Sequence, residues 1–345
     1  MTRAAATRSP SPAHHSDCTV LYPLTFQPIF KERVWGGRRL AALYGKPLPA
    51  GAPIGESWEI TDRPEGVSVI TNGPLAGHDL HWLMEHHRDA LLGAAQPVNG
   101  RFPLLVKLLD AHDKLSLQVH PPGALAAQLN GEPKTEAWYV GAAEAEADIY
   151  VGLRRDITRT EFERRLRDGT VAGCFHRLRV SRGDAMFLPS GRVHALGAGS
   201  VIFEIQQNSD TTYRVFDWNR VGLDNKPREL HLEQALASIA FDDFEPALVP
   251  AHFTETPHGR CRTLADAEGV FRMSEHQLRS DATTTFDRTG LFVIGVADGT
   301  ITLRGANTDL TLSPGHFALV PACVARTEVS AKTDATFLHA APWIP

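Results

Sequence analysis

The stretch GDAMFLPSGRVHALGAGSVIFEIQQNSDTTYRVFDWNR, residues 183–220, alternates short apolar runs with turn-forming residues. Its Pro189-Ser190-Gly191 segment is a tight-turn signal, because proline presets φ and glycine accepts the backbone conformations that turns require. Four short strands are therefore predicted here, and His194 lies at the start of one of them. The turn before this strand is expected to hold His194 inside the protein instead of in solvent.

A second stretch places more polar side chains on one strand face. Residues two apart on a strand point the same way, so in LSLQVH (115–120) Ser116, Gln118 and His120 share a face. Glu136 follows after a short loop, in the segment Lys-Thr-Glu. Together with His194, these Gln, His and Glu side chains form a set of nitrogen and oxygen donors. Such a set suits zinc or another divalent ion and leaves room for water or substrate.

Composition excludes several classes of protein. The chain has 345 residues and a formal net charge of −5, without a long basic run, so nucleic acid is not an expected partner. No apolar run has the length of a membrane span. The four cysteines lack metal or disulfide spacing, and the first residues lack the apolar core of a signal peptide. We therefore expect a cytoplasmic protein with a real hydrophobic core.

The chain is expected to divide into a tail and two domains. Residues 1–18 are predicted to be a disordered tail, and residues 19–245 to form the metal-binding catalytic domain with some helical elements. Three prolines then mark a boundary, at positions 246, 250 and 257. Residues 246–345 are expected to form a second, smaller barrel.

The second barrel is predicted to lack a metal site. Residues 315–321 repeat the spacing of residues 183–189, a glycine, five residues and a proline. However, Ala-Cys-Val-Ala follows in the second copy, where the first copy continues to His194. The missing histidine makes the second barrel a metal-free copy that packs against the first.

These motifs together resemble the type I phosphomannose isomerases, in particular their short bacterial form, within the cupin superfamily. The resemblance covers most of residues 20–345. It rests on SLQVHPP at 116–122, KTEAWYV at 134–140, PSGRVHA at 189–195 and FEIQQNSDTTYRVFDWNR at 203–220. It implies a mainly β fold, with two jelly-roll cupin barrels and a few short flanking helices.

The resemblance also implies a zinc-dependent enzyme that interconverts mannose 6-phosphate and fructose 6-phosphate through a cis-enediol. One zinc ion per chain, or another divalent ion, would be held by four ligands, which are Gln118, His120, Glu136 and His194. The family's catalytic arginine follows a Ser-Asp pair, and this pattern matches Arg214. The chain lacks the helical insertion of the larger family members, and the short members are less firmly tied to one sugar.

The remaining roles follow from the chemistry. Arg214 can offset the negative charge of an enediolate through fixed donors. Either Lys134 or Glu204 can serve as the base, and the sequence does not rank the two. Ser116 and Arg220 are expected to bind the phosphate. The expected partner is a small sugar phosphate, and the protein is expected to be a monomer or a weak homo-oligomer.

The main alternative is a non-catalytic cupin that binds a sugar phosphate as a sensor or regulatory module. Such a protein could dispense with Arg214 and Lys134, and both are present. A metal-dependent oxygenase is disfavoured, because Gln118 stands where such cupins carry their first histidine. The isomerase hypothesis is therefore preferred.

Overall fold

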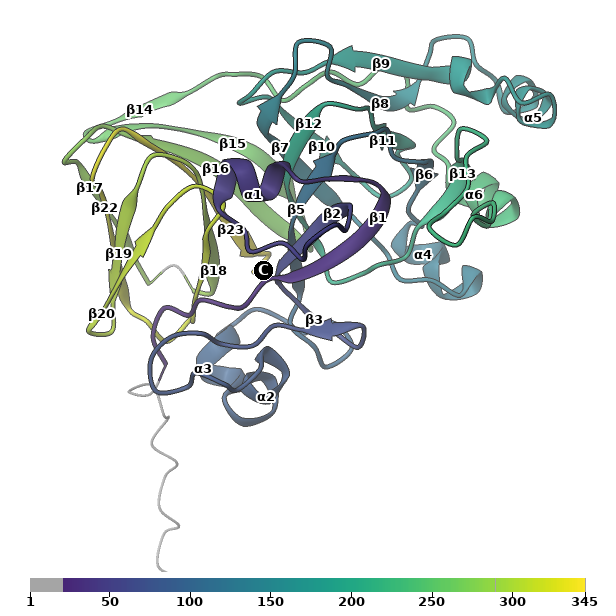
Figure 1. Cartoon of the computed structure of the whole chain (residues 1–345). Coiled ribbons are helices and arrows are strands. Elements are labelled where there is room, and N and C mark those ends of the chain that lie inside the picture. Colours follow the sequence, from purple (N-terminus) through teal and green to yellow (C-terminus); the bar gives the residue numbers. More distant parts are fainter. Residues whose placement is uncertain (1–20, 289, 345) are drawn as a thin grey trace, which may run out of the picture.

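The computed structural model describes residues 21–288 and 290–344, and most of the regular structure in them is β (Figure 1). The predicted mainly β class is confirmed. The predicted tail at residues 1–18 lies outside the described residues.

The first unit consists of two facing antiparallel sheets. The larger sheet has the order β1 (Ile29–Gly37), β2 (Ile54–Ile60), β5 (Leu104–Ala111), β12 (Ser200–Gln207), β7 (Glu136–Ala143), β10 (Ala185–Leu188). The smaller sheet has the order β13 (Tyr213–Phe216), β6 (Leu117–Val119), β11 (His194–Leu196), β8 (Asp148–Leu153), β9 (Phe175–Arg179). A separate pair is formed by β3 (Asp62–Arg63) and β4 (Gly66–Val67).

The second unit repeats this arrangement with one strand fewer in its smaller sheet. Its larger sheet has the order β14 (Thr254–Thr256), β15 (Gly259–Ala267), β16 (Phe271–Leu278), β23 (Ala335–Pro342), β18 (Phe292–Asp298), β21 (Phe317–Val320). Its smaller sheet has the order β17 (Thr283–Asp287), β22 (Arg326–Ala331), β19 (Ile301–Gly305), β20 (Thr308–Leu312). Each predicted barrel is thus a sandwich of two separate sheets, because no strand pairing in the described chain joins the sheets of a unit.

The side chains of strand β12 are buried in two different cores, one on each face of the sheet. Val201, Phe203 and Ile205 point to one side of the sheet, where the larger sheets of the two units pack against each other. Ile202 and Glu204 point to the other side, between the two sheets of the first unit. Strands buried on both faces read as nearly continuous apolar runs. A charged residue in such a run therefore marks an interior site.

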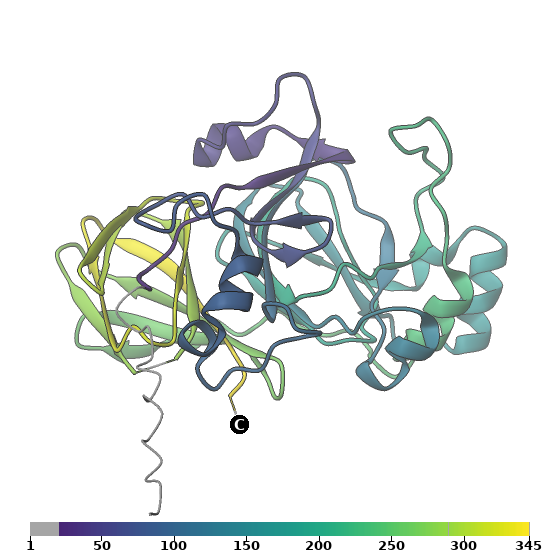
Figure 2. The same ribbon diagram turned by 90° about the horizontal axis from the view of Figure 1, so that it is seen from below.

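The helices are short and flank the sheets. They are α1 (Arg39–Tyr44), α2 (Leu80–His86), α3 (Arg88–Leu92), α4 (Gly123–Ala126), α5 (Arg159–Arg167), α6 (Leu232–Ser238) and two 3-10 turns (Ala127–Leu129 and Val171–Cys174). Helix α5 begins where the Thr158 hydroxyl accepts a hydrogen bond from the Glu161 amide, as an N-cap does. Figure 2 shows α5 and α6 at the end of the molecule opposite the second unit. No helix in the described part of the chain is long and apolar enough to cross a membrane.

Candidate active site

Three strands of the smaller sheet bring predicted site residues into one row. Arg214 on β13 pairs with Gln118 on β6, and Gln118 pairs in turn with His194 on β11. Because the three residues are directly opposite one another, their side chains leave the sheet on the same face. The neighbouring residues Leu117 and Ala195 point to the opposite face, into a separate apolar core under α5 and α6.

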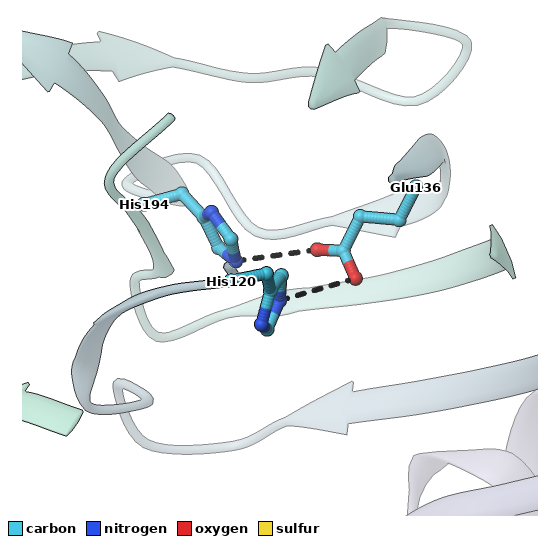
Figure 3. A group of neighbouring side chains, drawn as sticks. All are labelled: His120, Glu136 and His194. Atoms are coloured by element: carbon cyan, nitrogen blue, oxygen red, sulfur yellow. Dashed lines mark ion pairs between the residues drawn. The ribbon is translucent and has the colours of Figure 1, made fainter. Parts of the chain in front are cut away.

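His120, Glu136 and His194 form a compact group of candidate metal ligands. Both imidazoles point at the Glu136 carboxylate (Figure 3), with His194 Nε2 3.2 Å from Oε1 and His120 Nε2 3.5 Å from Oε2. One ligand atom from each residue lies within 4.8 Å of the others, and all three residues are buried. This is the only such group of three or more in the described residues.

The contacts around this group fit a metal ion. His120 Nδ1 is 2.8 Å from the Thr211 carbonyl and His194 Nδ1 is 2.9 Å from the Arg192 carbonyl. Each Nδ1–H therefore donates to the main chain, which makes each Nε2 an acceptor. Lys134 Nζ lies 3.2 Å from Nε2 of His120, and a side-chain amide lies near Nε2 of His194. Among the described residues, neither oxygen of buried Glu136 accepts a hydrogen bond of acceptable geometry, although Lys134 Nζ lies 2.7 Å from Oε2. Buried carboxylate oxygens usually have such partners, so the donor set fits a cation.

Gln118 lies beside the three charged ligands. Its Nε2 is 3.3 Å from His194 Nε2, and its Oε1 accepts a 3.4 Å hydrogen bond from Ser116 Oγ. A half-turn about the last side-chain bond exchanges the amide oxygen and nitrogen, so Gln118 can also present oxygen to the group.

Electrostatics keep the ligands in the form that binds metal. Burial, with help from the Lys134 charge, lowers the pKa of His120 to about 3. Burial also lowers the pKa of His194. Burial alone would raise the pKa of Glu136, but Lys134 and the two histidines bring it well below its ordinary value. Neutral imidazoles and an ionised carboxylate are the forms that bind a divalent ion.

A cavity of about 530 Å³ opens next to this group. Of the residues assigned roles from the sequence, Gln118, Lys134, Glu204 and Arg214 line it. Further charged residues, which sequence reasoning missed, also line it, namely Glu32, Arg33, Glu56, Lys107, Asp210, Asp224 and Arg228. The site is therefore more highly charged than the motifs alone indicated.

Lys107 is the most informative of the missed residues. Its side chain is buried, and Nζ lies 3.7 Å from Glu56, 3.6 Å from Glu204 and 3.5 Å from Asp210. Burial favours the neutral amine, but these carboxylates outweigh it and raise the pKa of Lys107. The signal was present in the sequence, since Lys107 interrupts the apolar run LLVKLL at 104–109.

Glu204 and Arg214 face the same cavity with different partners. Glu204 Oε1 accepts a 2.9 Å hydrogen bond from the Trp138 indole, and burial, followed by the charge of Glu136, raises the pKa of Glu204. Arg214 Nη1 donates to the Glu229 carbonyl at 2.7 Å, and its buried Nε has no hydrogen-bond partner among the described residues.

The two residues expected to bind phosphate do not line the cavity. Ser116 is buried beneath Gln118. Arg220 forms ion pairs with Asp217 at 3.0 Å and Asp113 at 3.3 Å. Local spacing placed Arg220 near Arg214, but the loop after β13 turns its guanidinium toward these carboxylates.

The fold and the site define a cupin-type β-sandwich protein with a candidate His-Glu-His metal centre at the edge of a charged cavity. Residues 24–154 match the model of the phosphomannose isomerase type I catalytic domain. The mannose-6-phosphate isomerase ManA of Bacillus subtilis is 42% identical over 219 residues, which are 63% of this chain and 68% of that protein. The chain belongs to the type I phosphomannose isomerase family, and it is an isomerase of that family.

Solved structures agree with this assignment. The crystal structure of the mannose 6-phosphate isomerase from Bacillus subtilis superposes with a TM-score of 0.84 at 28% identity, covering 92% of this chain and 99% of that one. A structure described as holo, zinc-bound mannose 6-phosphate isomerase matches with a TM-score of 0.72 at 18% identity, covering 93% of this chain and 99% of that one. The second likeness shows a shared fold.

Proposed function

We propose that this chain is a metal-dependent aldose–ketose isomerase that interconverts mannose 6-phosphate and fructose 6-phosphate through a cis-enediol. The observation that carries the proposal is the His120–Glu136–His194 group beside a cavity lined by Arg214 and Glu204, in a chain of this family. Residues 19–245 would form the catalytic domain, and residues 246–345 a metal-free companion.

The proposed metal is zinc, one ion per chain, held by Gln118, His120, Glu136 and His194. Two imidazoles, a carboxylate and an amide oxygen are donors that zinc accepts, and the zinc-bound relative of the same fold supports this choice. The ion would supply Lewis-acid polarisation of the sugar oxygens.

Glu204 is the proposed base that carries the proton between C1 and C2 of the sugar. It lines the cavity, and its raised pKa brings it closer to the range in which a base both accepts and releases a proton. Lys134 is held 2.7 Å from Glu136, so it would act as a cationic donor to a sugar oxygen. Arg214 would direct its unpartnered Nε–H at the oxygen on which negative charge develops.

A direct assay tests the proposal. Protein stripped with chelator and reloaded with zinc is given mannose 6-phosphate, and the formation of fructose 6-phosphate is followed. We expect turnover that zinc restores and that Arg214→Ala lowers about 100-fold or more, since an electrostatic donor to a developing oxyanion contributes this much. The matched control is Arg304→Ala, which removes an exposed arginine of the second unit. Absence of turnover in protein that still binds zinc would reject the proposed reaction.

A further inference from the structure

We propose that Arg228 is the side chain that makes this site select a phosphorylated sugar over the free sugar, by binding the phosphate beside Arg214. The inference rests on the proposed isomerase function and adds to it the residue that recognises the phosphate. Arg228 lies on the loop 217–230 between β13 and α6, which projects from the body of the molecule (Figure 2), and its side chain lines the cavity.

At the end of the cavity next to the candidate metal ligands, the lining cations are already paired with carboxylates. Three lining cations pair with three lining carboxylates and with the candidate ligand Glu136, namely Arg33, Lys107 and Lys134 with Glu56, Glu204, Asp210 and Glu136. Each of these cations already has a carboxylate within 3.7 Å. A phosphate placed there would have to compete with these carboxylates for every cation. The phosphate is therefore expected at the other end, where the loop 217–230 meets β13.

A single carboxylate, that of Asp217, holds the Arg228 side chain in its orientation toward the cavity. Arg228 Nε donates to Asp217 Oδ2 at 2.7 Å and its Nη2 donates to Asp217 Oδ1. A guanidinium has five N–H donors, so this clamp uses one edge and leaves the other edge free. Asp217 is buried and does not line the cavity, so it holds Arg228 from behind. A guanidinium fixed in this way matches the fork geometry with which arginine binds phosphate oxygens.

Arg214 is a second guanidinium that lines the same cavity. No carboxylate of the described residues lies within ion-pair distance of Arg214, and after burial the largest influence lowering its pKa is the positive charge of Arg228. Because the proposed reaction assigns Arg214 to the oxygen on which negative charge develops, the phosphate is left to the free edge of Arg228, and its negative charge offsets the repulsion between the two guanidiniums. Asp224 is the one carboxylate of the loop that lines the cavity, and its Oδ1 accepts a hydrogen bond from the Lys226 amide.

Arg220 offers a matched comparison because it shares the same carboxylate. It donates to Asp217 Oδ1 from Nε and Nη2, and it also pairs with Asp113. Unlike Arg228, it does not line the cavity. Removal of either arginine leaves Asp217 with one guanidinium, so the two variants disturb the loop to a similar degree and differ in what they remove from the cavity.

The experiment compares kcat/KM for mannose 6-phosphate with kcat/KM for free mannose in zinc-loaded wild type, Arg228→Ala, Arg228→Lys and Arg220→Ala. We expect Arg228→Ala to lower this ratio about 10- to 100-fold, the effect of losing charge-assisted hydrogen bonds. Arg228→Lys should restore part of it, because lysine keeps the charge but not the fork. The ratio in Arg220→Ala should stay within about twofold of wild type.

A second measurement separates this inference from the proposed reaction. Titration calorimetry of the zinc-loaded protein with inorganic phosphate should show weaker binding in Arg228→Ala than in Arg220→Ala. The inference is wrong if Arg228→Ala keeps the wild-type ratio or if Arg220→Ala lowers it equally. If the wild type does not turn over mannose 6-phosphate, the proposed reaction fails. The calorimetry then decides alone: selective loss in Arg228→Ala supports the phosphate site, and equal binding in the two variants rejects it.

Discussion

The two units of this protein have larger sheets with the same strand order, but their interiors differ. In the first unit, Glu136 on β7 pairs with Leu188 on β10. In the second unit, Phe292 on β18 pairs with Val320 on β21 at the corresponding step. The position of the candidate metal ligand is therefore taken by a phenylalanine.

The charged pair behind the ligands is replaced as well. Lys107 pairs with Glu204 across the larger sheet of the first unit, and at the matching step of the second unit Ser274 pairs with His339. His339 stacks on Phe286 at a ring distance of 4.9 Å, inside an aromatic and aliphatic core. The same fold thus carries either a network of buried charges or an apolar interior. This difference shows that the chemistry belongs to the side chains placed on the fold.

The largest expected effect comes from removing a candidate metal ligand from the first unit. Removal of a histidine from the second unit is the control. His120→Ala should abolish zinc binding and lower isomerase activity by roughly 1,000-fold or more, because the remaining residues no longer enclose the ion. Metal analysis and the coupled assay measure both quantities. The matched control, His276→Ala in the second unit, should keep both. Retention of zinc and activity in His120→Ala would overturn the ligand assignment.

The next effect concerns the base. Glu204→Gln should lower kcat by about 100- to 10,000-fold, the range for loss of a positioned acid–base group, and should keep the bound zinc. The corresponding change in the second unit, His339→Ala, should leave kcat near the wild-type value. An unchanged kcat in Glu204→Gln would transfer the role of base to another group, with Lys134 the first to examine.

The third prediction concerns stability. Lys107→Ala leaves Glu56 and Glu204 buried without their shared cation, and breaking a buried ion pair in this way costs about 3–5 kcal/mol. Urea denaturation should show this loss in the free energy of unfolding. Ser274→Ala, at the matching position of the second unit, should cost no more than about 1 kcal/mol. If Lys107→Ala and Ser274→Ala lowered the free energy of unfolding equally, the prediction that the buried cation stabilises the first unit would be wrong.

The smallest effect is a pH dependence that comes from the second unit. Burial lowers the pKa of His276 to about 4, below the ordinary value of 6.5. Because the pKa of His276 is lower in the folded protein than in the unfolded chain, the unfolded chain binds the proton more tightly than the folded protein. Stability therefore decreases as the pH falls. This contribution to stability is complete above pH 6.5 and is lost between pH 6.5 and pH 4.

His276→Phe should remove this contribution, because a phenylalanine can keep the parallel packing on Phe337. The difference in unfolding free energy between pH 7 and pH 5 should then shrink by on the order of 1–2 kcal/mol. Denaturation curves of both proteins at the two pH values measure it. An identical pH dependence would mean that His276 is free to ionise in the folded protein.

The sequence by itself determined the mainly β class, the membership of the family and the group of candidate ligands. It could do so because strand alternation and the Pro-x-Gly turn are local rules, which place Gln118 and His120 on one face and hold His194 at the start of a strand. The repeated glycine–proline spacing likewise indicated a second copy of the fold without its histidine.

Only the tertiary structure decided which charged residues line the cavity. Lys107 was hidden in an apolar strand, and its three carboxylate partners come from distant parts of the chain. Arg220 and Arg228 lie eight residues apart on one loop, and only the path of that loop turns Arg228 into the cavity and Arg220 away from it. The physical reason is that a loop side chain takes its direction from contacts with residues distant in the sequence, here the ion pair between Arg220 and Asp113, and not from its own spacing alone.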